Sequence, residues 1–130
     1  MNRKQKRKGA IIVTIKNIYI SGFRECFEQD TLSLYVADNG QWLLFDYDGY
    51  LIASHDSNDL HSEFRRFYEN ACFDSGIDDL ATRTSAIIKQ FYDGTYDGNI
   101  CTVCFISNQR EARIMDELGW NIILTRDIME

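Results

Sequence analysis

A chain of 130 residues is long enough for one domain to bury a core without a disulfide or a metal, and 45% hydrophobic residues exclude a disordered polymer. Five of the 14 basic residues fall within residues 1–9, which contain no acid: Arg3, Lys4, Lys6, Arg7 and Lys8. Residues 10–130 therefore carry 9 basic against 20 acidic side chains, or −11, which disfavours general binding to nucleic-acid phosphates and favours basic partners.

These features divide the chain into a basic flexible tail, residues 1–9, and a single domain, residues 10–130. The tail could contact nucleic acid, which we keep as one alternative for the function. No signal-peptide pattern is present, because the apolar run at residues 11–15 is interrupted by Thr14 and has no small-residue cleavage site. Since no apolar run reaches the roughly 18 residues of a membrane span, we expect a cytoplasmic protein with reduced thiols and no membrane contact.

The first half of the domain predicts antiparallel strands. Residues 10–20 are rich in β-branched side chains, and residues 32–36, 41–45 and 50–53 are three further short strands separated by turn residues. Asn39-Gly40 is a strong signal for a two-residue type I′ hairpin turn, and Asp48-Gly49 repeats that signal one strand later. The sequence therefore predicts an N-terminal antiparallel meander.

Two central helices and a C-terminal βαβ unit follow. Ser57 or Asn58 can cap a helix that runs to about residue 71, and a second helix is expected at residues 78–92. Residues 100–106 predict a strand buried on both faces, Asn108 caps a helix at residues 109–118, and residues 121–125 predict the last strand. Strand, helix and strand imply a parallel pair, so we predict an α+β fold with a mixed β-sheet.

The apolar run that ends in Asp46-Tyr47-Asp48-Gly49 resembles the first motif of the haloacid dehalogenase-like phosphatases and mutases, whose strand ends in Asp-x-Asp-Gly-Thr. Residues 103–108, which end in Ser107-Asn108, are similar to that family's second motif, an apolar strand ending in Ser or Thr that holds the phosphate. The resemblance implies magnesium-dependent phosphotransfer, with Asp46 as nucleophile, Asp48 as acid/base and Ser107 as phosphate ligand.

The same residues also fit a hairpin turn, and three departures from the family pattern favour the turn. Tyr50 stands where the family has Thr or Val, the family's Lys is missing after Ser107, and no acidic pair ends a later strand. Because Asp and Gly are typical turn residues, we expect Asp46 and Asp48 to form a hairpin turn. The phosphotransfer enzyme is kept as an alternative function.

Cys101 and Cys104 have the spacing of a zinc or redox pair. Residues three apart in a strand point to opposite faces, so the two sulfurs are not expected to share a metal, and we expect buried, unliganded thiols. His55 and His61 have no partners in the sequence that would complete a nucleophile triad. The sequence therefore predicts no catalytic residue, metal or cofactor.

Acidic residues and tyrosines cluster around the second predicted helix. Aromatic side chains ringed by acids are good anchors for a basic partner surface. We expect a non-enzymatic protein-interaction module, with the size and charge of the small acidic inhibitors and immunity proteins of bacteria, phages and mobile elements. The predicted partner-binding residues are Asp74, Asp78, Asp79, Tyr92, Asp93, Tyr96 and Asp97.

Overall fold

A computed structural model describes residues 14–20, 31–68 and 74–120 of the chain. The elements, in chain order, are β1 (Ile15–Ile20), β2 (Leu32–Ala37), β3 (Trp42–Phe45), β4 (Leu51–Ser54), α2 (Leu60–Phe67), α3 (Asp74–Asp93), β5 (Cys101–Thr102) and α4 (Gln109–Glu117). None of the helices in these ranges has the length and apolar character needed to cross a membrane.

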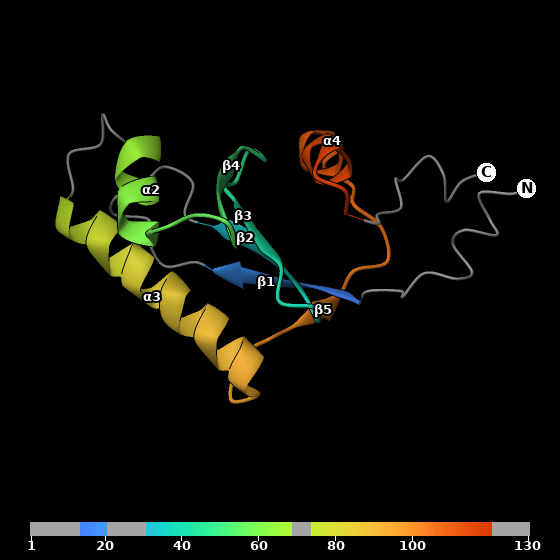
Figure 1. Cartoon of the computed structure of the whole chain (residues 1–130), viewed down its shortest axis with the longest axis horizontal. Coiled ribbons are helices and arrows are strands. Elements are labelled where there is room, and N and C mark those ends of the chain that lie inside the picture. Colours follow the sequence, from blue (N-terminus) through green and yellow to red (C-terminus); the bar gives the residue numbers. More distant parts are fainter. Residues whose placement is uncertain (1–13, 21–30, 69–73, 121–130) are drawn as a thin grey trace, which may run out of the picture.

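The five strands form one sheet in the order β4-β3-β2-β1-β5, with α2 and α3 on one side and α4 on the other (Figure 1). Every strand pair that the structure describes is antiparallel. The α+β class and the N-terminal meander are thus confirmed. The parallel pair expected of the βαβ unit is not seen among the described residues, because β5 pairs antiparallel with β1 and the predicted strand at residues 121–125 lies outside them.

The two hairpin loops of the meander have the same geometry. In the first, Ala37 donates its N–H to the carbonyl of Gln41 at 2.9 Å, and Gly40 donates to the carbonyl of Ala37 at 3.2 Å. In the second, the equivalent bonds join Asp46 to Tyr50 and Gly49 to Asp46. Each loop therefore has three residues, and its glycine has φ near +90°. The expected type I′ turns are wrong, since within the described ranges no residue other than glycine has a positive φ.

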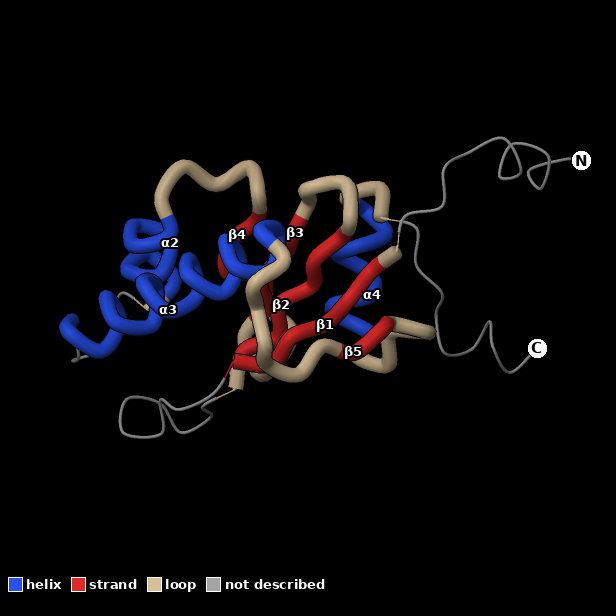
Figure 2. The backbone as a smooth tube through the Cα atoms, turned by 90° about the horizontal axis from the view of Figure 1, so that it is seen from below, coloured by secondary structure: helices blue, strands red, loops and turns tan. Residues whose placement is uncertain are grey.

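The sheet buries side chains on both of its faces. On β1 and β2, alternate residues such as Ile18, Leu34 and Val36 join the core with α2 and α3, while Ile15, Tyr35 and Ala37 join a second core with α4. Figure 2 shows that α4 lies across one end of the sheet, beside β1, β2 and β3. Because α4 is short, it covers only part of this sheet face.

The helices begin at polar caps, although the predicted limits shift. Asp59, not Ser57 or Asn58, caps α2 by accepting from the N–H of His61 at 3.3 Å. Residues 74–76, expected to end the first helix, instead begin α3, which starts four residues earlier than predicted. Asn108 caps α4 as expected, accepting from the N–H of Glu111 at 3.0 Å.

The prediction that residues 100–106 form one strand buried on both faces is wrong. Only Cys101–Thr102 is strand, both residues are exposed, and Cys104 is exposed as well. The physical reason is position: β5 lies at the edge of the sheet and pairs with β1 only at Lys16 and Asn17. The basic tail at residues 1–9, Cys26 and Cys72 lie outside the described residues.

Candidate binding site beside helix α4

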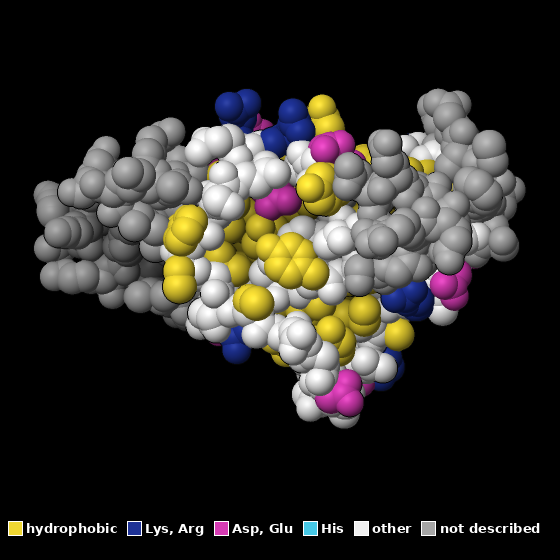
Figure 3. Space-filling view, turned by 180° about the vertical axis from the view of Figure 1, so that it is seen from behind, with side chains coloured by type: hydrophobic (Ala, Val, Ile, Leu, Met, Phe, Trp, Pro, Cys, Tyr) yellow, Lys and Arg dark blue, Asp and Glu magenta, His cyan; other side chains and the backbone are white. Residues whose placement is uncertain are grey.

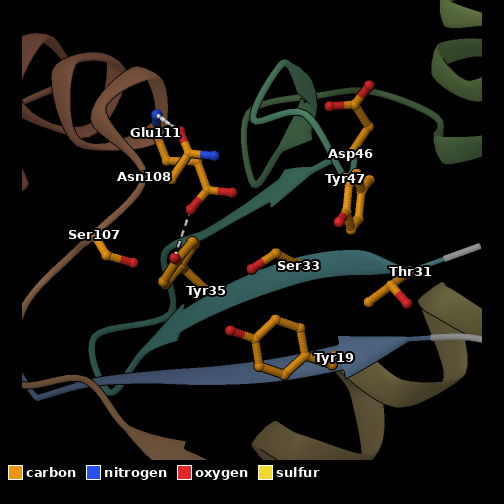
Figure 4. Close-up of a pocket in the computed structure, with 9 residues that line it drawn as sticks. All are labelled: Tyr19, Thr31, Ser33, Tyr35, Asp46, Tyr47, Ser107, Asn108 and Glu111. Carbon is orange, nitrogen blue, oxygen red and sulfur yellow. Dashed lines mark hydrogen bonds between the residues drawn. The ribbon is translucent and has the colours of Figure 1, made fainter. Parts of the chain in front are cut away.

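A hollow of about 240 Å³ opens on the sheet face beside α4 (Figure 4). Strands β1 and β2 form its floor, the β3–β4 turn forms one wall, and the segment leading into α4 forms the other. Its described lining is mostly polar and aromatic: Tyr19, Thr31, Ser33, Tyr35, Asp46, Tyr47, Ser107, Asn108 and Glu111.

Glu111 is the most deeply placed charge in the hollow. Its residue is only 5% exposed, and one carboxylate oxygen accepts a hydrogen bond from the hydroxyl of Tyr35 at 2.7 Å. Burial raises the pKa of Glu111 above its usual range, and the nearby Asp46 charge adds to this, while the bond from Tyr35 opposes it. Burial and the adjacent Glu111 also raise the pKa of Tyr35, so Tyr35 is a neutral donor.

Asp46 belongs to the wall formed by the β3–β4 turn. One carboxylate oxygen accepts the N–H of Tyr50 at 2.8 Å, closing the turn. Burial raises the pKa of Asp46, and backbone hydrogen bonds oppose that shift. In Figure 4 the Asp46 carboxylate points away from Ser107, whereas the ring of Tyr47 points into the hollow.

The β3–β4 turn docks directly on the start of α4. Arg110 donates to the carbonyl of Asp48 at 2.6 Å, and its guanidinium lies 4.1 Å from the centre of the Tyr50 ring. Gly49 faces the side chain of Asn108 so closely that a Cβ there would come within 2.7 Å of the amide oxygen. The Asp-Tyr-Asp-Gly stretch thus holds the hairpin against α4 and fixes the two walls of the hollow.

A second hollow of about 320 Å³ continues from the first toward β5 and shares Tyr19, Tyr35 and Ser107 with it. On the floor, Asn17 donates to Ser33 at 2.9 Å and to the carbonyl of Leu34 at 3.0 Å. Phe105 is 45% exposed at the outer end of this second hollow. Figure 3 shows hydrophobic side chains gathered across the middle of the face seen from behind Figure 1, with Lys and Arg side chains at its margins.

The lining has one sign of charge. The described residues around the two hollows include the acidic residues Asp46 and Glu111 and no Lys, Arg or His. No ion pair of Glu111 is present within residues 14–20, 31–68 and 74–120. A concave site with buried negative charge and tyrosines is suited to binding a cation.

The seven residues predicted to bind a partner lie elsewhere, along α3 and just beyond it. Asp79 and Asp93 are 14 residues apart, which is about 21 Å along a helix, so the set does not form one compact site. Asp74 is the first residue of α3. Asp78 pairs with Arg65 at 2.9 Å, and Asp93 pairs with Lys89 at 2.6 Å.

The two tyrosines of that set have structural contacts. The hydroxyl of Tyr92 donates to the carbonyls of Ala37 and Gln41 at 2.9 and 2.8 Å, which ties α3 to the first hairpin loop. Tyr96 is half-buried and packs against the core beneath α3. Asp79 and Asp97 are exposed acids available at the surface. The prediction that this helix binds a partner stays a prediction.

The residues of the phosphotransfer resemblance are only partly brought together. Asp46 and Ser107 line the same hollow, and Phe45 and Ile106 share one core. Asp48 is exposed and is not among the described lining residues. Phe45 lies in an antiparallel hairpin, in which Asp46 and Asp48 occupy the turn that the sequence predicted.

The cysteines and histidines form no further centre in the described ranges, where no group of three or more His, Cys, Asp or Glu side chains is placed to hold a metal. Cys101 and Cys104 are free thiols. His55 lies beside the backbone of Trp42, and His61 lies 3.3 Å from the hydroxyl of Thr82.

Tyr19, Tyr35 and Glu111 were missed by sequence reasoning. One signal was present: Ser33 and Tyr35 alternate with apolar residues on β2, which predicts a polar group on the second face of the sheet. Glu111 follows the Asn108 cap by three residues, a spacing that predicts an exposed capping carboxylate, and only the packing of α4 on β2 turns it toward Tyr35.

Comparisons with known proteins give no match to a protein family, to a curated protein or to a solved structure.

Proposed function

We propose that the protein is a non-enzymatic interaction module that binds a basic surface of a partner protein, in the manner of small acidic inhibitors and immunity proteins. The observation that carries the proposal is the hollow beside α4, whose described lining includes the buried carboxyl group of Glu111 and three tyrosines and no basic side chain. The charge of −11 on residues 10–130 supports it, because such a charge steers a basic partner toward the domain.

The hollow is a better candidate for the contact surface than the acids of α3. Binding energy concentrates in central pockets lined by aromatic residues, whereas charges on an open helix contribute little. Two of the α3 acids, Asp78 and Asp93, are already paired within the chain, and the hydroxyl of Tyr92 donates to a loop of the same chain. Partner capture should therefore depend on the hollow.

Quantitative affinity capture from the source cell tests both surfaces at once. The hollow variant carries Glu111→Gln with Tyr47→Ala, and the α3 variant carries Asp79→Lys with Asp97→Lys. We expect the hollow variant to lose a basic partner that the wild type enriches, and the α3 variant to retain it. Loss with the α3 variant alone would assign the contact to the helix, and no enriched basic protein with any form would refute the proposed function.

Phosphotransfer is a second candidate, because Asp46 and Ser107 line one hollow. It requires magnesium-dependent hydrolysis of a generic phosphoester that Asp46→Asn removes. We expect no such activity, because Asp46 closes the hairpin turn through Tyr50 and Asp48 lies in the same turn, outside the described lining of the hollow. Hydrolysis that is lost with Asp46→Asn would overturn the non-enzymatic proposal.

Nucleic-acid binding through the basic tail is a third candidate, carried only by the five basic residues within residues 1–9. It predicts salt-sensitive binding that disappears when residues 1–9 are deleted. Retention of the affinity without the tail would exclude the tail as the contact.

A further inference from the structure

We infer that the hollow beside α4 receives an arginine side chain of the partner, with Glu111 as its counter-ion and the rings of Tyr19 and Tyr47 beside the guanidinium. This inference rests on the proposed function and assigns its recognition chemistry to named residues. It also separates the hollow from the exposed acids of α3, which would bind any basic surface without selecting a side chain.

The first step is the placement of Glu111. One carboxylate oxygen is engaged by Tyr35, and Figure 4 shows the other pointing into the space between Tyr35 and Tyr47. A carboxylate in a buried position is costly unless it is paired with a positive charge and hydrogen-bonded. The described lining supplies the hydrogen bond but no positive charge, so a partner's cation placed there would find a carboxylate oxygen that no described basic side chain pairs with.

The second step is the aromatic rim. Tyr19 is 62% exposed and Tyr47 is 57% exposed, although both line the hollow, and neither belongs to the two cores formed by the described residues. A guanidinium stacks on a tyrosine face and gains from the ring's negative electrostatic potential. The described residues show this kind of contact where the β3–β4 turn meets α4, since the guanidinium of Arg110 covers the ring of Tyr50 at 4.1 Å.

The third step is size and donor count. A volume of about 240 Å³ lies below the range of roughly 300 to 1,000 Å³ that is typical of drug-sized ligands and fits a single long side chain. Arginine carries five N–H donors in a planar fork, whereas lysine carries a compact ammonium. The amide oxygen of Asn108 is engaged by the N–H of Glu111, but the hydroxyl of Ser107 and the second carboxylate oxygen of Glu111 border the space, so a donor-rich planar cation matches it best.

The fourth step is the path of the partner's main chain. The second hollow, which reaches Phe105 and β5, begins where the first ends and contains no charged residue in its described lining. An extended segment can therefore cross Tyr19 with its arginine in the acidic hollow and an uncharged neighbour against Phe105. A shared floor of tyrosines fits this continuous contact better than two separate small-molecule sites.

The test is a nuclear magnetic resonance titration of the full-length ¹⁵N-labelled protein with acetyl-Gly-Arg-Gly-amide. The matched peptide carries citrulline, which keeps the shape of arginine without its charge, and a third carries lysine. We expect saturable shifts at the amides of Tyr35, Ser107, Asn108 and Glu111, with affinity at least about tenfold higher for arginine than for citrulline, which corresponds to one unit of log affinity. Equal shifts with citrulline, or an equal affinity for lysine, would overturn the inference.

Variants then connect the affinity to the named residues. Glu111→Gln should abolish the preference for arginine over citrulline, and Tyr47→Ala, an exposed position at which the fold should persist, should weaken arginine binding several-fold. Asp79→Asn on α3 is the matched control and should leave the titration unchanged. Undiminished arginine binding in both hollow variants, or shifts centred on α3, would refute the assignment.

The inference and the proposed function can fail separately. A basic partner captured from the cell by a protein that ignores the arginine peptide would refute the inference alone. Arginine selectivity in the hollow without any basic protein partner would refute the proposed function but would support the arginine site in the hollow.

Discussion

Gly49 should be the most sensitive glycine of the meander, because it combines a left-handed backbone with close contact to the cap of α4. Its φ is +91°, and a Cβ there would come within 2.7 Å of the amide oxygen of Asn108. Gly49→Ala should cost about 1 to 2 kcal/mol for the backbone and about 1 kcal/mol more for the displaced cap. The expected loss in free energy of unfolding is therefore about 2 to 3 kcal/mol.

Gly40→Ala is the matched control, since Gly40 has φ of +95° in the same kind of loop and an added Cβ would meet nothing within 4 Å. Urea unfolding of both variants should give a loss of only about 1 to 2 kcal/mol for Gly40→Ala. In an Asn108→Ala background, the excess cost of Gly49→Ala should disappear, because the displaced cap is already absent. An equal or larger loss for Gly40→Ala would refute the docking of the β3–β4 turn on α4.

Two further predictions concern the hydrogen-bonded groups of the two faces. Burial raises the pKa of Glu111, so the folded chain holds a proton in a pH range above the usual value of 4.5 where the unfolded chain has released it. Stability of the wild type should fall as pH rises through this range. Glu111→Gln should not show that fall. In thermal unfolding, the Tm of the variant should therefore match that of the wild type at about pH 4 and exceed it at about pH 7. Parallel pH profiles of Tm would contradict the buried carboxylate. Tyr92→Phe should cost about 1 kcal/mol by removing its bonds to the first hairpin loop, whereas Tyr50→Phe, which keeps its ring under Arg110, should change stability by less than about 0.5 kcal/mol. Equal losses in denaturant unfolding would argue against the tie between α3 and the loop.

Local signals in the sequence predicted most of the elements, and tertiary packing decided the rest. Alternation on residues 32–36 and the cap at Asn108 depend on neighbours along the chain, so both could be predicted. The hairpin loops were predicted in position but not in type, because Asp-Asn-Gly and Tyr-Asp-Gly allow both two-residue and three-residue loops. The exposure of Cys101, Thr102 and Cys104 could not be predicted from the apolar composition of residues 100–106, since only the strand order shows that β5 is an edge.

The candidate site was harder to predict than the fold, because its residues come from four separate stretches of the chain. Tyr19, Tyr35, Tyr47 and Glu111 are each ordinary in their own segment, and only the crossing of α4 over β2 brings them together. In the sequence the Asp-Tyr-Asp-Gly stretch fits both a phosphotransfer motif and a hairpin turn, and its described contacts are those of a turn that docks on α4. Charge composition predicted a basic partner, which stays a prediction, but it could not distinguish an open acidic helix from a hollow.

The side-chain pKa of Glu111, measured by carbon-detected nuclear magnetic resonance with and without saturating acetyl-Gly-Arg-Gly-amide, tests the central claim most directly. In the free protein, Glu111 should titrate above the usual value of 4.5, because burial disfavours its charged form. With the peptide bound, a guanidinium beside the carboxylate should lower that pKa, while the citrulline peptide should leave it unchanged. A pKa that does not respond to the arginine peptide would contradict Glu111 as the counter-ion and, with it, the hollow as the binding site.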